Sequence, residues 1–110
     1  MFASVYTDAA TIDVTETLEY ISYTLNTPIA SKNLFYEIDK KIKEIENNPY
    51  SCPLVRNDYL ANKGFRWIGI KNYMMFYIVN EKREKIYLIR FLYGRRDWIN
   101  ILKEEITNNN

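Results

Sequence analysis

The residues best suited to act on a negatively charged partner are arginines in the C-terminal half of the chain. Arg66 lies among apolar residues, so its guanidinium must be paired or must line a pocket open to solvent, because an unpaired buried charge is costly. Arg90 lies late in another apolar run, and Arg95 and Arg96 directly follow Gly94. Guanidinium groups bind phosphate and carboxylate oxygens through parallel N–H donors. These four arginines are therefore the candidates for binding an anionic group such as phosphate.

Arg95 and Arg96 stand where a C-terminal helix should begin. Two cations at that position oppose the helix dipole. The free backbone N–H groups together with two guanidiniums would instead form a site for an anion. The alternative is that Asp97 caps the helix and pairs with one arginine locally. At the level of sequence both interpretations are open.

Cleavage of RNA without a metal ion needs a base for the 2′-hydroxyl, a cation for the phosphate and an acid for the leaving oxygen. Arginine fills the second role but is a poor acid or base, because its pKa lies far above neutrality. The nearby candidates for the other roles are Lys63, Asp58, Tyr59 and Tyr93. Tyr59 is also able to stack on a base, although aromatic residues near a sheet more often belong to the core.

No metal site and no cofactor are expected. The chain has no histidine and one cysteine, Cys52, which makes a structural zinc site very improbable. A single cysteine forms no internal disulfide, and this suits a reducing cytoplasm. No apolar segment approaches the roughly 20 residues that span a membrane, and the N-terminus does not read as a signal peptide. We expect a cytoplasmic protein with no membrane partner.

The net charge of +1 conceals two halves of opposite sign. Residues 1–55 carry four Lys or Arg and eight Asp or Glu, whereas residues 56–110 carry eleven and six. A basic C-terminal half favours a surface for a polyanion or for an acidic protein partner. Charge dispersed over the surface explains the same numbers equally well.

The arginines need rigid elements to hold them, and the strongest pattern is three apolar runs over 65–71, 73–79 and 85–93. β-Branched and aromatic residues dominate each run, and short polar breaks separate them. This predicts three consecutive antiparallel strands. Residues 2–6 alternate weakly between apolar and polar types and predict a short first strand.

Two amphipathic helices separate the first strand from the other three. The first begins near Ala9 after a cap at Thr7 or Asp8, and the second covers 28–47 with Pro28 at its first position. Apolar residues repeat at spacings of three and four, namely Val14, Leu18, Ile21 and Leu25, then Phe35, Ile38, Ile42 and Ile45. The short link between the helices predicts an αα-hairpin packed on the sheet.

These elements predict an α+β fold with an N-terminal strand, an αα-hairpin, a three-stranded antiparallel meander and a C-terminal helix over about 97–106. We expect an irregular loop over 48–64, a single domain over 1–107 and a disordered tail over 108–110. Both faces of the meander are apolar. The hairpin is expected to cover one face and the C-terminal helix part of the other, so any open apolar sheet would bind a partner or a second copy in a homodimer.

Three motifs follow one another in the C-terminal half, namely Gly64-Phe65-Arg66, then Asn72-Tyr73 with Phe76-Tyr77-Ile78-Val79, and then Ile89-Arg90-Phe91-Leu92-Tyr93-Gly94-Arg95-Arg96-Asp97. Tyr20-Ile21, Pro28 and Asn48-Pro49 precede them. The joint order resembles the RelE/ParE superfamily of bacterial type II toxins. The resemblance implies a growth-inhibiting toxin that a cognate antitoxin holds inactive.

Members of the superfamily act in two ways. RelE-like members cut mRNA on the ribosome, and the resemblance implies that Arg66 contacts the scissile phosphate and that Arg96 is a second catalytic arginine. The lysines that precede the Gly-aromatic-Arg motif in RelE-like members fall on Asn57 and Tyr59 here, and the C-terminal catalytic tyrosine falls near Leu102. ParE-like members inhibit DNA gyrase, and the well-formed helical hairpin is closer to theirs.

We therefore expect a toxin that acts by ribosome-dependent mRNA cleavage. Inhibition of DNA gyrase by protein–protein binding is the close alternative, and a non-catalytic basic interaction module is the third. The candidate catalytic residues are Arg66, Arg96, Tyr93 and Lys63, and the candidate phosphate-binding residues are Arg66, Arg90, Arg95, Arg96 and Tyr59. The expected partners are an acidic, partly apolar antitoxin that covers the sheet and the arginines, and either the ribosome with its mRNA or gyrase.

Overall fold

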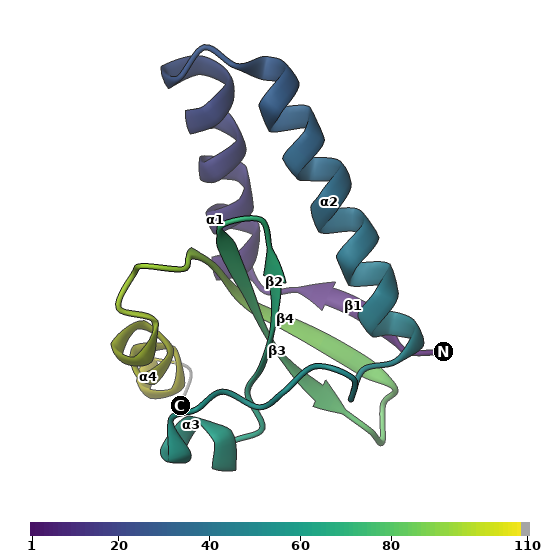
Figure 1. The fold of residues 1–110 in the computed structure, drawn as a ribbon. Coiled ribbons are helices and arrows are strands. Elements are labelled where there is room, and N and C mark those ends of the chain that lie inside the picture. The colour runs from purple at the N-terminus through teal and green to yellow at the C-terminus, as the bar shows by residue number, and fades with distance from the viewer. Residues whose placement is uncertain (109–110) are drawn as a thin grey trace.

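The structure, a computed structural model that describes residues 1–108, is a four-stranded sheet with helices on both faces (Figure 1). The strand order is β1-β4-β3-β2. Strand β1 (Ala3–Tyr6) pairs in parallel with β4 (Lys85–Tyr93), whereas β3 (Tyr73–Asn80) lies antiparallel to both β4 and β2 (Arg66–Ile70). The α+β fold predicted from the sequence, with its N-terminal strand and antiparallel meander, is confirmed.

The helical hairpin connects β1 to the meander. Helix α1 (Asp8–Glu19) begins after Thr7, whose hydroxyl accepts a hydrogen bond from the Ala10 N–H at 3.2 Å. It continues into one π-helical segment, η1 (Tyr20–Thr24). The chain then turns through Asn26, which takes a positive φ of 54°, and α2 (Pro28–Asn47) begins with its proline at the start. In Figure 1 the hairpin rises well beyond the sheet.

One face of the sheet packs against the lower part of the hairpin. Its core joins buried side chains of both helices to buried side chains of all strands except β1, namely Ala10, Val14, Leu34, Ile38, Ile42, Ile45, Ile70, Met75, Tyr77, Ile86, Leu88 and Phe91. Two positions predicted for this face are wrong: Leu25 is 51% exposed and Phe35 is 52% exposed. Leu25 lies at the tip beyond the sheet, and Leu34 takes the buried position on α2 in place of Phe35.

The opposite face of the sheet is covered too. Buried and partly buried residues of the 55–65 segment and of helix α4 (Trp98–Asn108) pack against Phe76 and Leu92. The expected irregular loop over 48–64 contains a short helix, α3 (Asp58–Asn62), which begins where the Asn57 side chain accepts a hydrogen bond from the Leu60 N–H at 3.0 Å. The C-terminal helix covers part of this face, as expected, and the 55–65 segment adds to that cover, which the sequence did not predict.

The C-terminal helix is longer than the sequence predicted. Helix α4 extends to Asn108, so this residue is helical and not part of a disordered tail. The rest of that predicted tail, residues 109–110, lies outside the described residues. Among the helices of residues 1–108, none is both long and apolar enough to cross a membrane.

Candidate functional site

Arg66, the first residue of β2, contacts the loop that follows the hairpin. Its Nη1 donates a hydrogen bond to the Cys52 carbonyl oxygen at 2.6 Å, and its guanidinium carbon lies 5.2 Å from the centre of the Tyr50 ring. The side chain is half-buried. The sequence required Arg66 to be paired or open to solvent, and a carbonyl oxygen together with an aromatic face meets that requirement.

A buried tyrosine lies directly across the sheet from Arg66. Tyr77 pairs with Arg66 in the β2–β3 register, and its hydroxyl donates to the Pro49 carbonyl oxygen at 2.9 Å. Burial raises the pKa of the Tyr77 phenol, and the positive charge of Arg66 only partly opposes that rise. The Tyr77 hydroxyl therefore holds the loop at Pro49 in place. Because the phenol stays protonated near neutral pH, it is poorly suited to act as a base.

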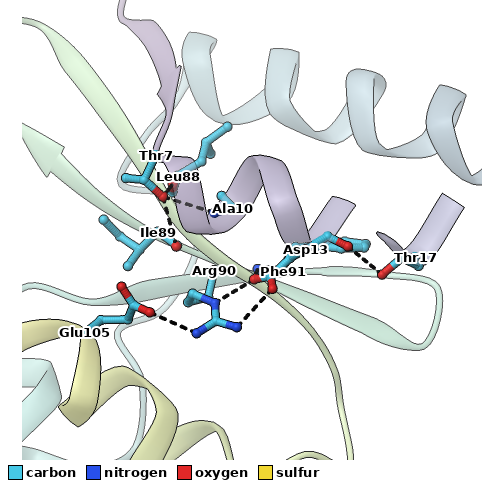
Figure 2. A network of polar contacts seen from close by, with 9 residues as sticks. All are labelled: Thr7, Ala10, Asp13, Thr17, Leu88, Ile89, Arg90, Phe91 and Glu105. Carbon is cyan, nitrogen blue, oxygen red and sulfur yellow. Dashed lines mark hydrogen bonds and ion pairs between the residues drawn. The ribbon is translucent and has the colours of Figure 1, made fainter. Parts of the chain in front are cut away.

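Arg90 is held by two carboxylates of its own chain (Figure 2). Its Nε and Nη2 donate to both oxygens of Asp13 at 2.6 and 2.9 Å, and its Nη1 donates to Glu105 at 2.9 Å. The hydrogen bonds that Arg90 donates to Asp13 contribute most to raising the pKa of Arg90. The predicted phosphate-binding role would require these contacts to break, so the arrangement favours a structural role that joins α1, β4 and α4.

The same carboxylate also binds an irregular part of β4. Phe76 pairs with Arg90 and Tyr77 with Leu88, so Ile89 is an extra residue, a β-bulge. Asp13 accepts a hydrogen bond at 3.0 Å from the backbone N–H of Phe91, the residue after Arg90. Thr7 donates to the carbonyl oxygens of Leu88 and Ile89 (Figure 2). Helix α1 thus fixes the bulge from its first turns.

Arg95 and Arg96 lie exposed in the loop between β4 and α4, next to the exposed Tyr93. The alternative from the sequence is confirmed in one part: Asp97 directly precedes α4 and caps it, but within residues 1–108 it pairs with neither arginine. Asp97 instead accepts hydrogen bonds from the backbone and side chain of Asn100 at 3.5 and 2.7 Å. Within residues 1–108 neither arginine forms an ion pair.

The sheet register separates Arg66 from Arg96. Arg66 lies at the start of β2, whereas the last residue of that strand, Ile70, pairs with Tyr73, which pairs in turn with Tyr93. Four residues of extended chain span roughly 13 Å. Arg66 therefore lies level with Tyr77 in the middle of β3, roughly 13 Å along the strands from the end of the meander that carries Tyr93 and the loop with Arg96.

Lys63 and Tyr59 form a third group on the face of α3. The ammonium nitrogens of Lys63 and Lys103 lie 5.5 and 5.7 Å from the centre of the Tyr59 ring, which is half exposed. The sequence placed Lys63 in the catalytic set and Tyr59 in the phosphate-binding set. In the structure Lys63 contacts the Tyr59 ring, and Lys103 of α4 contacts the same ring. Nothing in the sequence pattern pointed to Lys103. Within residues 1–108 no cluster of three or more His, Cys, Asp or Glu side chains is arranged to hold a metal ion.

A groove of about 460 Å³ lies between the exposed edge strand β1 and the two hairpin helices. Apolar side chains form most of its wall and charged side chains of α2 form its rim; its lining includes Tyr6, Val14, Phe35, Ile42, Asp39 and Lys43. Lys43 pairs with Asp39 at 3.1 Å. The sequence did not reveal this groove, because the helical spacing of Phe35 predicted a position in the core.

Comparison with known proteins supports one family. The model of the ParE toxin of the type II toxin-antitoxin system parDE matches residues 5–98. A solved structure described as the chromosomal ParDE toxin-antitoxin system from P. aeruginosa is similar with a TM-score of 0.67 and 14% sequence identity, over 84% of this chain and 96% of that one. A search of curated proteins found no match. The likeness to the solved structure concerns the fold, and the family match spans most of the sequence: the chain belongs to the ParE toxin family of type II toxin-antitoxin systems.

Proposed function

We propose that this toxin arrests growth by binding DNA gyrase through protein–protein contacts and not by cutting mRNA. The observation that carries the proposal is the separation of the arginines. Metal-free cleavage needs a cation, a base and an acid within reach of a single phosphate. Arg66 lies roughly 13 Å along the strands from the end of the meander where the loop with Arg96 begins, and Arg90 is bound to Asp13 and Glu105. The sequence favoured mRNA cleavage over gyrase inhibition, and this proposal reverses that preference.

The family match supports the same choice, because gyrase inhibition is the activity that the resemblance attached to ParE-like members. The surface is also suited to protein contacts. Large apolar residues of the hairpin are exposed, among them Ile12, Tyr20, Tyr23, Leu25, Ile29 and Phe35. Exposed apolar residues gathered on one projecting element are typical of protein-binding surfaces.

A supercoiling assay tests the proposal. Purified toxin is titrated into gyrase holoenzyme with relaxed plasmid and ATP, and in parallel into translating ribosomes carrying a defined mRNA. We expect a dose-dependent loss of supercoiling while the mRNA stays intact. Cut mRNA together with undiminished supercoiling would overturn the proposal and restore the ribonuclease interpretation.

We further propose that the cognate antitoxin binds the groove between β1, α1 and α2. Both sheet faces are already covered by this chain, so the antitoxin has no open sheet to cover. The groove supplies an apolar floor with a charged rim, which suits an amphipathic antitoxin segment that folds on binding.

Phe35→Glu tests this placement, because Phe35 lines the groove and is half exposed, so the change should not disturb the core. We expect the affinity for purified antitoxin to fall by at least tenfold in calorimetric titrations. Tyr36→Glu is the matched control, since Tyr36 is the next residue of α2, is 60% exposed and does not line the groove. Equal losses in the two variants would contradict the placement.

A further inference from the structure

Two loops meet at the end of the sheet that lies far from Arg66. The N–H of Gly94, in the loop after β4, donates to the carbonyl oxygen of Asn72, in the turn between β2 and β3, at 2.8 Å. A Cβ at Gly94 would lie 3.3 Å from that oxygen, so the approach is close. Next to Asn72, Lys71 takes a positive φ of 55°, which shapes the turn. The turn and the loop therefore form one continuous surface.

Three cations occupy this surface, and we call it the loop cluster: Lys71, Arg95 and Arg96, with Tyr73 and Tyr93. All three cationic side chains are exposed, and none forms an ion pair within the described part of the chain. The nearest carboxylate in the sequence, Asp97, is turned towards Asn100. Like charges held on adjoining loops without a neutralising carboxylate repel one another, and a bound anionic group would relieve that repulsion.

Tyrosines adjoin the cations. The rings of Tyr73 and Tyr93 lie 5.8 Å apart with an edge-to-face angle of 70°, and Tyr93 is 42% exposed. Burial raises the pKa of the Tyr73 phenol, and the neighbouring phenols of Tyr93 and Tyr20 raise it further. Tyr73 packs against the same core cluster as Leu18 and Ile21 of the hairpin, so this part of the loop cluster lies on the side of the sheet that the hairpin covers.

The hairpin tip itself carries no charge. Residues 20–31 contain no Asp, Glu, Lys or Arg, and Tyr23, Leu25 and Ile29 are exposed there. A ligand that reaches from the loop cluster to the tip would meet cations first and then neutral aromatic and aliphatic side chains. Tyrosine and arginine side chains together are typical of the energetic centres of protein interfaces.

A nucleic acid fits this surface poorly. Domains that bind nucleic acid through their charge usually have an isoelectric point above about 9 and neutralise several phosphates in a row. The isoelectric point of this chain is about 7.7, and residues 20–31 of the hairpin carry no charge that would add to the three cations. An acidic peptide segment with interspersed apolar residues matches both the charge and the apolar neighbourhood.

We propose that the loop cluster binds an acidic segment of the toxin's protein target. This inference rests on the proposed function, since it assumes that the target is a protein. The antitoxin groove is lined by β1, α1 and α2, and none of the five cluster residues lines it. The two surfaces are thus separate sites on the chain.

Peptide binding tests the cluster without any assumption about gyrase. The probes are a fluorescent decapeptide of eight glutamates and two phenylalanines, and a fluorescent ten-nucleotide oligothymidylate, both at low salt. We expect the peptide to bind the native chain and to bind Lys71→Glu/Arg96→Glu at least tenfold more weakly. Lys82→Glu/Arg83→Glu, an equal charge reversal in the turn between β3 and β4, should change the affinity less than threefold.

Two outcomes of this titration would overturn the inference. Equal weakening by both charge reversals would mean that net charge, and not the cluster, binds the peptide. Tighter binding of oligothymidylate, lost only in the cluster variant, would make the surface a nucleic-acid site.

Assays of gyrase inhibition and of antitoxin binding then decide whether the acidic segment belongs to the target or to the antitoxin. The cluster variant should need at least tenfold more toxin to inhibit supercoiling, while its affinity for antitoxin stays within threefold. Loss of antitoxin affinity with inhibition unchanged would assign the cluster to the antitoxin and overturn the inference. If the native toxin fails to inhibit gyrase, the proposed function fails by itself, and the peptide titration still decides whether the cluster binds acidic segments.

Discussion

At the scale of residues, the partly buried charges are the most informative. Arg90, Asp13 and Glu105 are each less than a quarter exposed, and they join the hairpin, the sheet and the last helix. Breaking a buried ion pair by removing one partner is expensive, because the other charge keeps its desolvation cost. The network therefore positions both the hairpin and the loop after β4, which are the elements proposed to meet partners.

Asp13→Asn should destabilise the fold by about 3 kcal/mol. Arg90 would lose a carboxylate that accepts hydrogen bonds with both oxygens, and the Phe91 N–H would lose a charged acceptor. Urea unfolding followed by circular dichroism measures the change. Asp39→Asn is the control, since Asp39 pairs with Lys43 on the exposed side of α2 and should cost no more than about 0.5 kcal/mol. Similar losses in the two variants would show that the network is not structural.

Tyr77 makes stability depend on pH in the alkaline range. Burial raises the pKa of its phenol above the ordinary value of 10.0. Above about pH 10 the unfolded chain loses this proton while the native chain keeps it, so the free energy of unfolding falls as pH rises. Below that pH both states are protonated, and the contribution of Tyr77 is constant.

Tyr77→Phe should lower stability by about 1–2 kcal/mol at pH 7, because the buried Pro49 carbonyl oxygen loses its donor. It should also make stability fall less steeply between pH 9.5 and 11, as measured by urea unfolding at stepped pH. Tyr23→Phe, at an 80% exposed position, should change neither quantity. An unchanged alkaline slope in Tyr77→Phe would refute the assignment.

At the scale of elements, periodicity predicted the long helices and strands but not the short ones. The three apolar runs became β2, β3 and β4 almost residue for residue, because their alternation and β-branched content extend over whole strands. Helix α3 has five residues, too few for a helical period to appear. Its signal was the cap, Asn57 before Asp58, in a segment read as an irregular loop.

Asn57→Ala should cost about 1 kcal/mol, because the Leu60 N–H would lose its capping acceptor and α3 would fray over Val55 and Phe65. Thermal unfolding followed by circular dichroism provides the measurement. Asn62→Ala, at the exposed end of the same helix, serves as the control and should have little effect. If the two alanine variants melt at the same temperature, the cap does not hold α3 in place.

The candidate site was predictable only in part, because sequence distance does not reveal sheet register. Arg66 and Arg96 looked like members of one pocket, and the family motifs supported this. The antiparallel register separates Arg66 from the end of the meander that carries Arg96, and only the paired residues of β2, β3 and β4 reveal that separation. Lys71 was missed for the same reason, since its neighbour Asn72 meets Gly94 through a contact between distant segments.

At the scale of the whole molecule, the chain is a covered sheet with a projecting hairpin and two separate surfaces. The groove beside β1 is apolar with a charged rim, and the loop cluster is basic and rich in tyrosine. A toxin that binds its target and its antitoxin at different sites needs no catalytic constellation. Its effect then depends on affinity for the target, and antitoxin control depends on the affinity of the groove.

The most direct test of the central claim is made in cells that express the toxin without its antitoxin. Plasmid topoisomers and the ends of a reporter mRNA are measured in the same culture during growth arrest. The proposed mechanism predicts that plasmids lose negative supercoils while the mRNA ends stay unchanged. New mRNA ends that appear while plasmid supercoiling is preserved would contradict it.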